Sequence, residues 1–269
     1  MRFFFPGCAI FLFLISVAVT SSSAASLEPL GMLDAQLLPK NHAELRIGAS
    51  YQDGTRNLFR SGGNRRRLSE LPSLTLNLGL GERVEGQLQY SYLQLKKKGQ
   101  SNQWGSGDLT VGLKVRLWQE SPRLPAMAVR LATKLPNASF RDDFGTNQFD
   151  FFMDFLATRN YSTFSTYLNL GLAILGEPRR GFSGQDDSFR YAVGVQAPLL
   201  SNRLHGLMSV EGMAGNQSIN HRCALKTGIQ LFIGRWMWDL GGSVGLHSRS
   251  ENWGVRTGLT LPFTLSSNW

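Results

Sequence analysis

Cysteine is scarce in this chain: Cys8 and Cys223 are the two among 269 residues. Cys8 lies in an N-terminal segment that we expect to be removed, so the remaining chain cannot form an internal disulfide. No Cys-x-x-Cys motif occurs, which argues against a structural zinc site. Four histidines are scattered over different expected strands and loops, without metal-ligand spacing: His42, His205, His221 and His247. We therefore predict neither a metal nor a cofactor.

Long apolar runs are also absent after the first 25 residues. A membrane-spanning helix needs about 20 consecutive apolar residues, and no later stretch approaches that length. This excludes a helical membrane protein. A membrane β-barrel stays open, because its strands alternate between apolar and polar residues and average to a hydropathy near zero.

Residues 1–25 have the order of a secretory signal peptide. A single charge, Arg2, precedes an apolar run over Ala9–Val19 and a string of small residues. The apolar run is too short to span a membrane comfortably, so we expect cleavage after Ala25 rather than an anchor. Residues 26–40 show no clear period, and we predict a periplasmic N-terminal segment there.

From residue 41 onward the chain reads as a succession of β-strands. In Asp108–Leu117, for example, leucine and valine occupy every odd position, while polar residues or glycine occupy the even ones. A period of two is that of a strand with one apolar face. We predict twelve strands, at about 41–52, 72–81, 83–95, 106–118, 125–136, 146–158, 161–175, 187–198, 203–214, 221–233, 235–247 and 252–269.

The expected connections alternate between long and short. The long ones are 53–71, 96–105, 137–145 and 176–186, and the short ones are 81–82, 159–160, 199–202 and 234. Long loops on one rim and tight turns on the other are typical of a transmembrane up-and-down antiparallel β-barrel. With twelve strands, both chain ends fall on the short-turn side, which is the periplasm. We therefore predict an all-β fold, with the barrel over residues 41–269.

The polar face of these strands carries charges of both signs, which suits a barrel lumen as well as the wet side of a β-sandwich. Aromatic residues near strand ends on the apolar face favour the barrel, because membrane barrels carry such rings at both interfaces. They are Tyr51, Tyr90, Trp236, Trp238, Trp253 and Trp269. We expect the apolar face to contact outer-membrane lipid. The charged residues expected in the lumen are Glu44, Arg46, Glu85, Asp108, Lys114, Arg116, Arg130, Lys134, Asp150, Asp154, Arg190, Glu211, Arg222, Lys226, Asp239 and Arg256.

The chain ends in an amphipathic strand with an aromatic terminus. Leu259, Leu261 and Phe263 lie on one face of this strand, and Trp269 is the last residue; Ser267 departs from the apolar pattern. The arrangement resembles the assembly signal of bacterial outer-membrane barrels. We expect the barrel-assembly machinery to bind this strand and the protein to reside in the bacterial outer membrane.

The formal net charge is +9, and much of the excess lies in expected loops. These basic loop residues are Arg56, Arg60, Arg65, Arg66, Arg67, Lys96, Lys97, Lys98, Arg179 and Arg180. No recognition helix or aromatic-studded strand accompanies them, so we predict no nucleic-acid binding. An anionic surface, or water alone, is the expected partner of these loops.

One segment carries a family resemblance. In Gly105–Pro136 a Gly-x-Gly-Asp turn leads into a strand ending in Lys-x-Arg, and a second strand ends in Lys-x-Pro. This resembles the bacterial outer-membrane family named for a meta-pathway of phenol degradation, although Asn137-Ala138 replaces its usual Thr-Gly. The resemblance implies an outer-membrane barrel linked to uptake of small, often aromatic or apolar compounds.

A barrel of twelve strands is narrower than a general porin, and side chains fill much of its lumen. We therefore predict a narrow channel or transporter for small solutes, and keep a structural or surface-binding barrel as the alternative. Unpaired charges in such a lumen are costly, so basic residues should pair with acidic ones and constrict the passage. The hypothesis has Lys114, Arg116, Arg130 and Lys134 interlock with acids such as Asp108, Asp150 and Asp154.

A barrel-embedded lipid hydrolase is the third alternative. Nucleophilic catalysis needs a histidine within hydrogen-bond reach of a serine. The nearest local candidate is the run His247–Asn252, but adjacent residues of a strand face opposite ways, so His247 and Ser248 would diverge. We predict no enzymatic activity and assign no catalytic residue.

Deleting Trp269 should lower the amount of folded barrel in the outer membrane without changing the stability of the fraction that folds. The reason is that the terminal ring belongs to the assembly signal. Folded and unfolded protein separate by their migration on gels before and after boiling. A chain ending at Asn268 that reached normal outer-membrane levels would show that the terminal ring plays no part.

Overall fold

A computed structural model describes residues 31–56, 65–97, 99–176, 185–215 and 221–265. The predicted signal peptide, residues 26–30 and Trp269 lie outside these ranges. The regular elements in the described ranges are strands joined by turns and loops, and the strands form a single antiparallel sheet. Within the same residues, no helix is long and apolar enough to cross a membrane.

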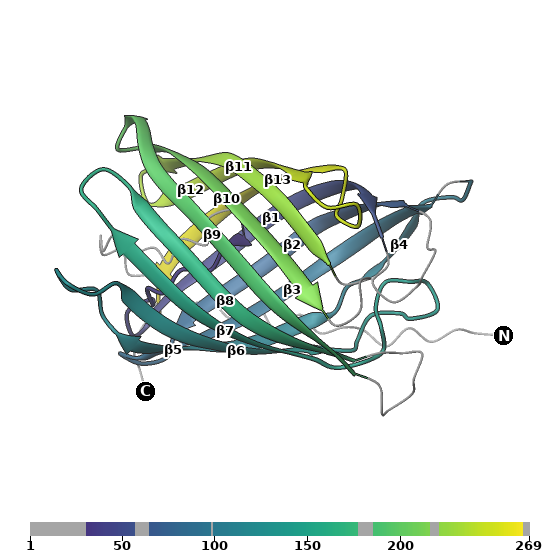
Figure 1. Ribbon diagram of the computed structural model, residues 1–269, viewed down its shortest axis with the longest axis horizontal. Helices are drawn as coiled ribbons and strands as arrows, with labels where there is room; N and C mark the ends of the chain where they lie inside the picture. Colours follow the sequence, from purple (N-terminus) through teal and green to yellow (C-terminus); the bar gives the residue numbers. More distant parts are fainter. Residues whose placement is uncertain (1–30, 57–64, 98, 177–184, 216–220, 266–269) are drawn as a thin grey trace, which may run out of the picture.

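Thirteen strands form this sheet, and Figure 1 shows them wrapped around one axis. The strands are β1 (His42–Thr55), β2 (Arg66–Gly79), β3 (Val84–Lys97), β4 (Gln103–Ser106), β5 (Leu109–Trp118), β6 (Ala126–Leu135), β7 (Asp150–Asn160), β8 (Ser165–Gly176), β9 (Gln185–Ser201), β10 (Leu204–Gly215), β11 (Arg222–Ile233), β12 (Trp236–Gly245) and β13 (Trp253–Thr264).

The sheet closes into a barrel through the pairing of β1 with β13, from His42 opposite Thr264 to Asp53 opposite Trp253. All other neighbours are consecutive in the chain, apart from β4 and β5. These two pair with different parts of β3, so β4 is an extra strand that continues the line of β5. The predicted twelve-stranded up-and-down barrel is therefore confirmed. Short turns lie at the left end in Figure 1, and the long connections lie at the right end near β4.

In the sequence of β3 the alternation of apolar and polar residues slips near Tyr92-Leu93, and from the sequence alone a bulge in this strand would explain the slip. The structure instead places the irregularities in the two neighbouring strands. The β2–β3 register shifts between Glu70 and Ser73, and the line of β4 and β5 breaks at Gly107-Asp108. Pro72 lies in the first irregularity, where its missing N–H costs no ladder hydrogen bond. Strand ends otherwise agree with the predicted ones within a few residues, except that β2 begins at Arg66 and shortens the predicted loop 53–71.

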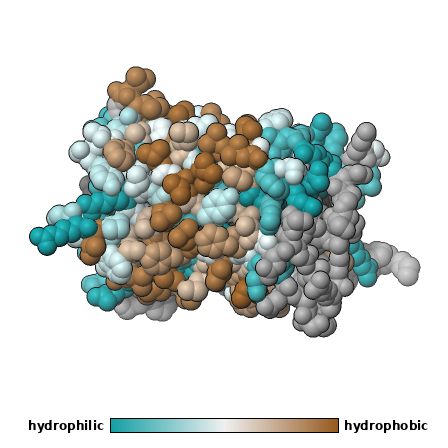
Figure 2. Space-filling model, viewed as in Figure 1, coloured by the Kyte–Doolittle hydropathy of each residue, from teal (hydrophilic) through white to brown (hydrophobic). Residues whose placement is uncertain are grey.

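Apolar side chains point outward and charged ones point inward. Lys114 is 1% exposed, whereas Leu113 beside it in β5 is 47% exposed. Leu113, Leu131, Met153 and Leu172 stand opposite one another in a row across β5 to β8, and all four are exposed. Apolar residues cover much of the barrel wall in Figure 2, and hydrophilic ones gather at the long-loop end. Such a surface is stable in lipid, so the predicted membrane-spanning barrel is confirmed and the sandwich is excluded.

Aromatic rings mark both rims of the apolar wall. At the long-loop rim, Tyr51 contacts Trp253 with ring centroids 5.2 Å apart, and Tyr92 stacks on Trp104 at 6.0 Å. At the short-turn rim, the exposed rings include Trp118, Tyr161 and Trp236. Rings at these depths match the headgroup regions of a bilayer. The sequence had singled out Tyr51, Trp236 and Trp253 for this role.

Replacing Leu131 by Arg should destabilise the barrel by about 2–4 kcal/mol, because it puts a charge on the lipid face near the middle of a strand. Leu131 is 54% exposed, so in a water-soluble fold the same change would cost little. Urea unfolding in lipid vesicles measures the difference.

Leu200→Arg is the matched control, since Leu200 is 91% exposed and lies at the β9–β10 turn. There the cost should be about 0–1 kcal/mol, as expected near the interface. Equal effects of the two substitutions would contradict the assignment of the lipid face.

Candidate functional site

The lumen is the candidate functional site, because the inward side chains of all strands converge there. Its wall is polar, and several of its charged residues are fully or almost fully buried. They are Glu44, Glu85, Lys114, Arg130, Asp150, Asp154, Asp186 and Asp239. Buried charges need partners in their own surroundings, and the lumen supplies them.

Residues 31–41 enter this lumen from the short-turn end. The sequence predicts a periplasmic segment at residues 26–40. In the structure its described part, residues 31–40, lies inside the barrel. At the rim, Asn41 donates its N–H to the Gly79 carbonyl (2.9 Å), and the Leu265 N–H donates to the Asn41 carbonyl (2.7 Å). A Cβ at Gly79 would stand 2.0 Å from the Pro39 carbonyl oxygen, so only glycine admits the chain here. We call residues 31–41 the lumen segment.

Lys114 and Glu85 hold the lumen segment by its backbone. The Lys114 Nζ lies 2.9 Å from Glu85 Oε1, and it also donates to the carbonyls of Gln36 (2.9 Å) and Asp34 (3.2 Å). The second carboxylate oxygen of Glu85 accepts the Leu38 N–H at 2.8 Å. The buried ion pair therefore has its remaining hydrogen-bonding capacity satisfied by the segment, as a stable buried pair requires.

Asp34 forms the second polar attachment. Its Oδ1 accepts the Gln36 N–H (2.9 Å) and the Thr158 hydroxyl (2.8 Å), while the Thr158 Oγ1 accepts the Ala35 N–H (3.0 Å). Burial raises the pKa of the Asp34 carboxyl to about 6, and the nearby Lys114 ammonium limits the rise. Docking of the segment is thus linked to the protonation of one carboxyl group.

Apolar contacts complete the attachment of the lumen segment. Leu33, Ala35 and Leu37 form one buried cluster with strand residues Ala126, Ala128 and Leu156. Met32 forms another buried cluster with Tyr167 and Ala192. A Cβ on Gly194 would stand 2.3 Å from the Met32 Cε, so the glycine leaves room for this side chain. Small inward residues on β6 and β9 therefore make the space that the segment fills.

Ion pairs cross-link the wall beside the segment. Arg130 Nη1 lies 3.2 Å from Asp154 Oδ2, and Arg190 Nη1 lies 3.1 Å from the other oxygen of Asp154. Lys134 Nζ lies 2.6 Å from Asp150 and 3.4 Å from Asp108. The predicted pairing of Arg130 and Lys134 with these acids is therefore present.

Two details differ from the predicted constriction. Lys114 pairs with Glu85, which was not among the acids named as partners. Arg116 makes no ion pair with any residue that the structure describes, and it lies beside the β5–β6 register shift near the short-turn rim. Sequence reasoning also missed the lumen segment, which lies inside the barrel against wall residues of several strands. Its apolar residues at positions 32, 33, 35, 37 and 38 were an available signal of burial.

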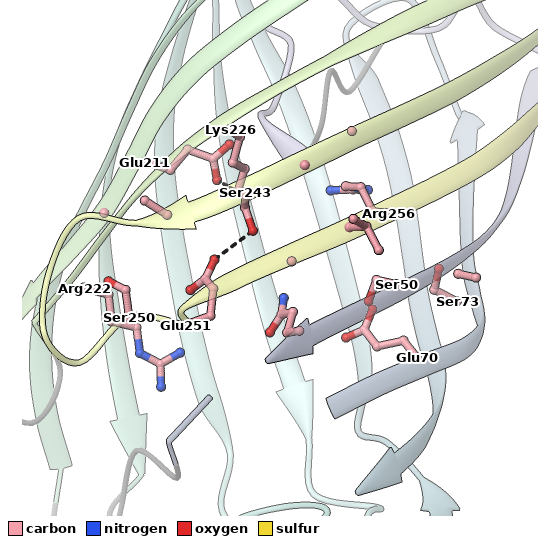
Figure 3. A pocket seen from close by; sticks show the side chains of 18 of the residues that line it. Ser50, Glu70, Ser73, Glu211, Arg222, Lys226, Ser243, Ser250, Glu251 and Arg256 are labelled. Atoms are coloured by element: carbon pink, nitrogen blue, oxygen red, sulfur yellow. Dashed lines mark hydrogen bonds and ion pairs between the residues drawn. The ribbon is translucent and has the colours of Figure 1, made fainter. Parts of the chain in front are cut away.

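A cavity of about 420 Å³ lies between the lumen segment and the long-loop end. The charged residues that line it are Arg46, Glu70, Arg190, Glu211, Arg222, Lys226, Glu251 and Arg256, and Figure 3 shows most of them with the serines around them. Lys226 pairs with Glu211 at 2.5 Å, and the Ser243 hydroxyl donates to Glu251 at 3.2 Å. Arg256 Nη1 lies 2.7 Å from the position of a Cβ on Gly31, so the described start of the segment lies beside one of the residues that line the cavity.

Glycine makes room for Arg46 in the wall of this cavity. Arg46 binds Asp239 through two hydrogen bonds, Nε to Oδ2 at 3.0 Å and Nη2 to Oδ1 at 2.7 Å. A Cβ on Gly258 would stand 2.3 Å from Arg46 Nη2, and one on Gly48 would stand 2.7 Å from Nη1. The two-point geometry fixes the guanidinium plane against the wall, which keeps the cavity open.

The structure brings two histidines together, with the rings of His221 and His247 6.1 Å apart at the long-loop end. The His221 Nε2 bonds the Gly215 carbonyl, and the His247 Nδ1 accepts the Arg249 N–H. His42 and His205 lie elsewhere, at the short-turn rim. In the described ranges, no group of three His, Cys, Asp or Glu residues could hold a metal ion.

The run His247–Asn252 forms the connection between β12 and β13. The Ser250 hydroxyl accepts the Cys223 N–H (2.9 Å) and donates to the Cys223 carbonyl (2.7 Å). Asn252 donates to Asp53 Oδ2 at 3.0 Å. Ser250, His247 and Asn252 thus have separate hydrogen-bond partners, and this geometry gives the lipid-hydrolase alternative no support.

Among curated proteins, none matches the chain in sequence. An outer-membrane channel from Pseudomonas putida F1 is similar in structure, with 11% sequence identity and a TM-score of 0.67 over 86% of this chain and 98% of that one. The β-domain of the Bordetella autotransporter Brka is also similar, with 11% identity and a TM-score of 0.50 over 82% of this chain and 99% of that one. Both likenesses show the barrel fold. The family described as the putative MetA-pathway of phenol degradation matches residues 68–264. That span reaches from β2 to the end of β13, and the chain belongs to this family of outer-membrane barrels.

Proposed function

We propose that this protein is a narrow outer-membrane channel for small solutes, closed in its resting state by the lumen segment. The observation that carries the proposal is a polar lumen that holds a segment outside the strand ladder, bound by Lys114 and Glu85. Such a segment can leave without breaking any pairing between strands. The resemblance to a channel from Pseudomonas putida F1 and the family's link to phenol degradation support a role in solute passage.

The cavity limits the size and the chemistry of the solute. A dry cavity of about 150 Å³ holds benzene, so the 420 Å³ above the lumen segment suffices for a small aromatic compound. Charged and hydroxyl groups dominate its lining, which favours a solute that carries a polar or ionised group on its ring. A structural barrel with no transport role would not need this open half of the lumen.

Residues 1–25 and the end of the chain complete the proposal. We infer export by the signal peptide and insertion by the barrel-assembly machinery through β13. The position of β13 supports the second point, since its pairing with β1 closes the barrel.

Replacing Leu33 and Leu37 together by Ala should raise single-channel conductance in planar bilayers well above a small wild-type value. Each truncation removes buried contacts that are worth about 2–5 kcal/mol in protein cores, and it leaves the barrel wall intact. The segment should therefore leave the lumen for a larger fraction of the time.

Arg116→Ala is the matched control, because Arg116 lies on the lumen side of β5 but does not contact the described part of the segment. Its conductance should equal that of the wild type. A wild type that already conducts like an open porin, or a folded double variant that stays silent, would contradict closure by the lumen segment.

Acidification should favour the closed state. The pKa of Asp34 is about 6 when the segment is docked and 3.8 for a free carboxyl, so the docked state binds more protons between these values. Protonation of Asp34 therefore stabilises the docked segment at pH 5, and this stabilisation is lost as the pH rises through 6. The open-to-closed ratio should therefore increase about tenfold between pH 5 and 7.5. Single-channel recordings measure it, and Asp34→Asn should abolish the dependence; an unchanged dependence in that variant would exclude Asp34 as its source.

A further inference from the structure

A second cavity, of about 460 Å³, lies at the long-loop rim over the ends of β1, β2 and β3. Its lining is strongly cationic. The basic residues are Arg65, Arg66, Arg67, Lys96 and Lys97, and the acidic residue among them is Asp53. Neighbouring strands place these cations side by side, since Arg67 stands opposite Lys96 and Arg66 stands opposite Lys97 in the β2–β3 ladder.

The pleat of the strands divides these cations into two sets. Tyr92 is exposed on the lipid side of β3, and Lys96 lies four residues further on the same face. Leu71 is likewise exposed on β2. The side chain of Arg67, four residues before Leu71, points to the same side of the sheet. Arg67 and Lys96 therefore point outward, while Arg66 and Lys97 turn to the lumen side, where both contact Asp143.

Acidic groups do not balance the outward cations. Arg67 pairs with Asp53 at 3.1 Å, yet its side chain stays 55% exposed. Asp53 also accepts a hydrogen bond from Asn252, and Arg65 reaches the Ser248 carbonyl at 3.4 Å. Lys96 is exposed, and no carboxylate of the described chain pairs with it. An anion that entered the cavity would meet exposed ammonium and guanidinium groups with donors to spare.

The depth of the cluster identifies the source of the anion. The aromatic pairs Tyr51–Trp253 and Tyr92–Trp104 mark the long-loop boundary of the apolar wall. Lys96 lies about 13 Å beyond Tyr92 along β3, at about 3.3 Å per residue. Cations on the outer face of the barrel at that height stand where the phosphate groups of outer-leaflet lipid lie, and long basic side chains reach such groups while their stems cover apolar surface.

We propose that Arg65, Arg67 and Lys96 form a binding site for the phosphate groups of a lipopolysaccharide molecule in the outer leaflet. The sugar phosphates would enter the cavity, and the acyl chains would run down the apolar wall below Tyr92 and Trp104. Arg67 and Lys96 point away from the lumen, so occupancy of this site is separate from solute passage. The proposed site gives a function to part of the excess of basic residues. From the sequence, an anionic surface and water alone were both open as their partners.

Native mass spectrometry of the purified barrel with lipid A tests the proposal. The double variant Arg67→Ala/Lys96→Ala should bind bisphosphorylated lipid A with roughly 10- to 30-fold lower affinity than the wild type, from the loss of two basic contacts. The wild type should bind lipid A lacking both phosphates about as weakly as the double variant binds the phosphorylated form.

Arg123→Ala/Arg235→Ala is the matched control, because it removes two exposed cations from the short-turn rim. It should bind lipid A like the wild type. Migration before and after boiling shows that each variant has folded. If Arg67→Ala/Lys96→Ala bound lipid A as tightly as the control variant does, the proposed site would be overturned. Displacement of lipid A by millimolar inorganic phosphate would also overturn the lipid assignment, because it would show a site for soluble anions.

Discussion

Within a bilayer, every backbone N–H and C=O group of this chain must find its partner in the protein itself, and the rest of the structure depends on that requirement. The ladder between β1 and β13 meets it by leaving the sheet without an edge. Closure in turn fixes the direction of each side chain. Odd positions of β5 face lipid and even positions face a lumen, so one alternating pattern provides both a membrane-compatible surface and a charged interior.

Closure with twelve strands creates a lumen too narrow to behave as bulk water. Charges placed there need partners, and the Arg130–Asp154–Arg190 and Lys134–Asp150 contacts provide them along the wall. Lys114 and Glu85 differ from these pairs, because their remaining hydrogen bonds go to the backbone of the lumen segment. The wall and the segment therefore stabilise each other in the short-turn half. The long-loop half keeps an open cavity, and this difference between the halves underlies the proposed channel.

Much of the fold could be predicted from the chain, because lipid imposes a strict period of two. The alternation in β5 and β6 identified strands, faces and the lumen positions of Lys114, Arg130 and Lys134. Irregular places were predicted less well. The slip near Tyr92 was assigned to β3, although the neighbouring strands carry the irregularities at Leu71-Pro72 and at Gly107-Asp108. A bulge belongs to a pair of strands, so one strand's pattern cannot say which partner carries the extra residue.

The sequence by itself determined the fold class, the strand count, the lipid-facing residues and the charged character of the lumen, since each follows from local periodicity. Only the tertiary structure decided what fills that lumen. The lumen segment has no period, and its attachment depends on residues of distant strands. These are Gly79, Thr158 and also Asn169, whose side-chain amide donates to the Leu33 carbonyl at 3.1 Å. The same holds for Glu85 as the partner of Lys114, and for the cation cluster that β2 and β3 bring together at the rim. Such contacts join residues far apart in the chain, and only closure of the barrel makes them neighbours.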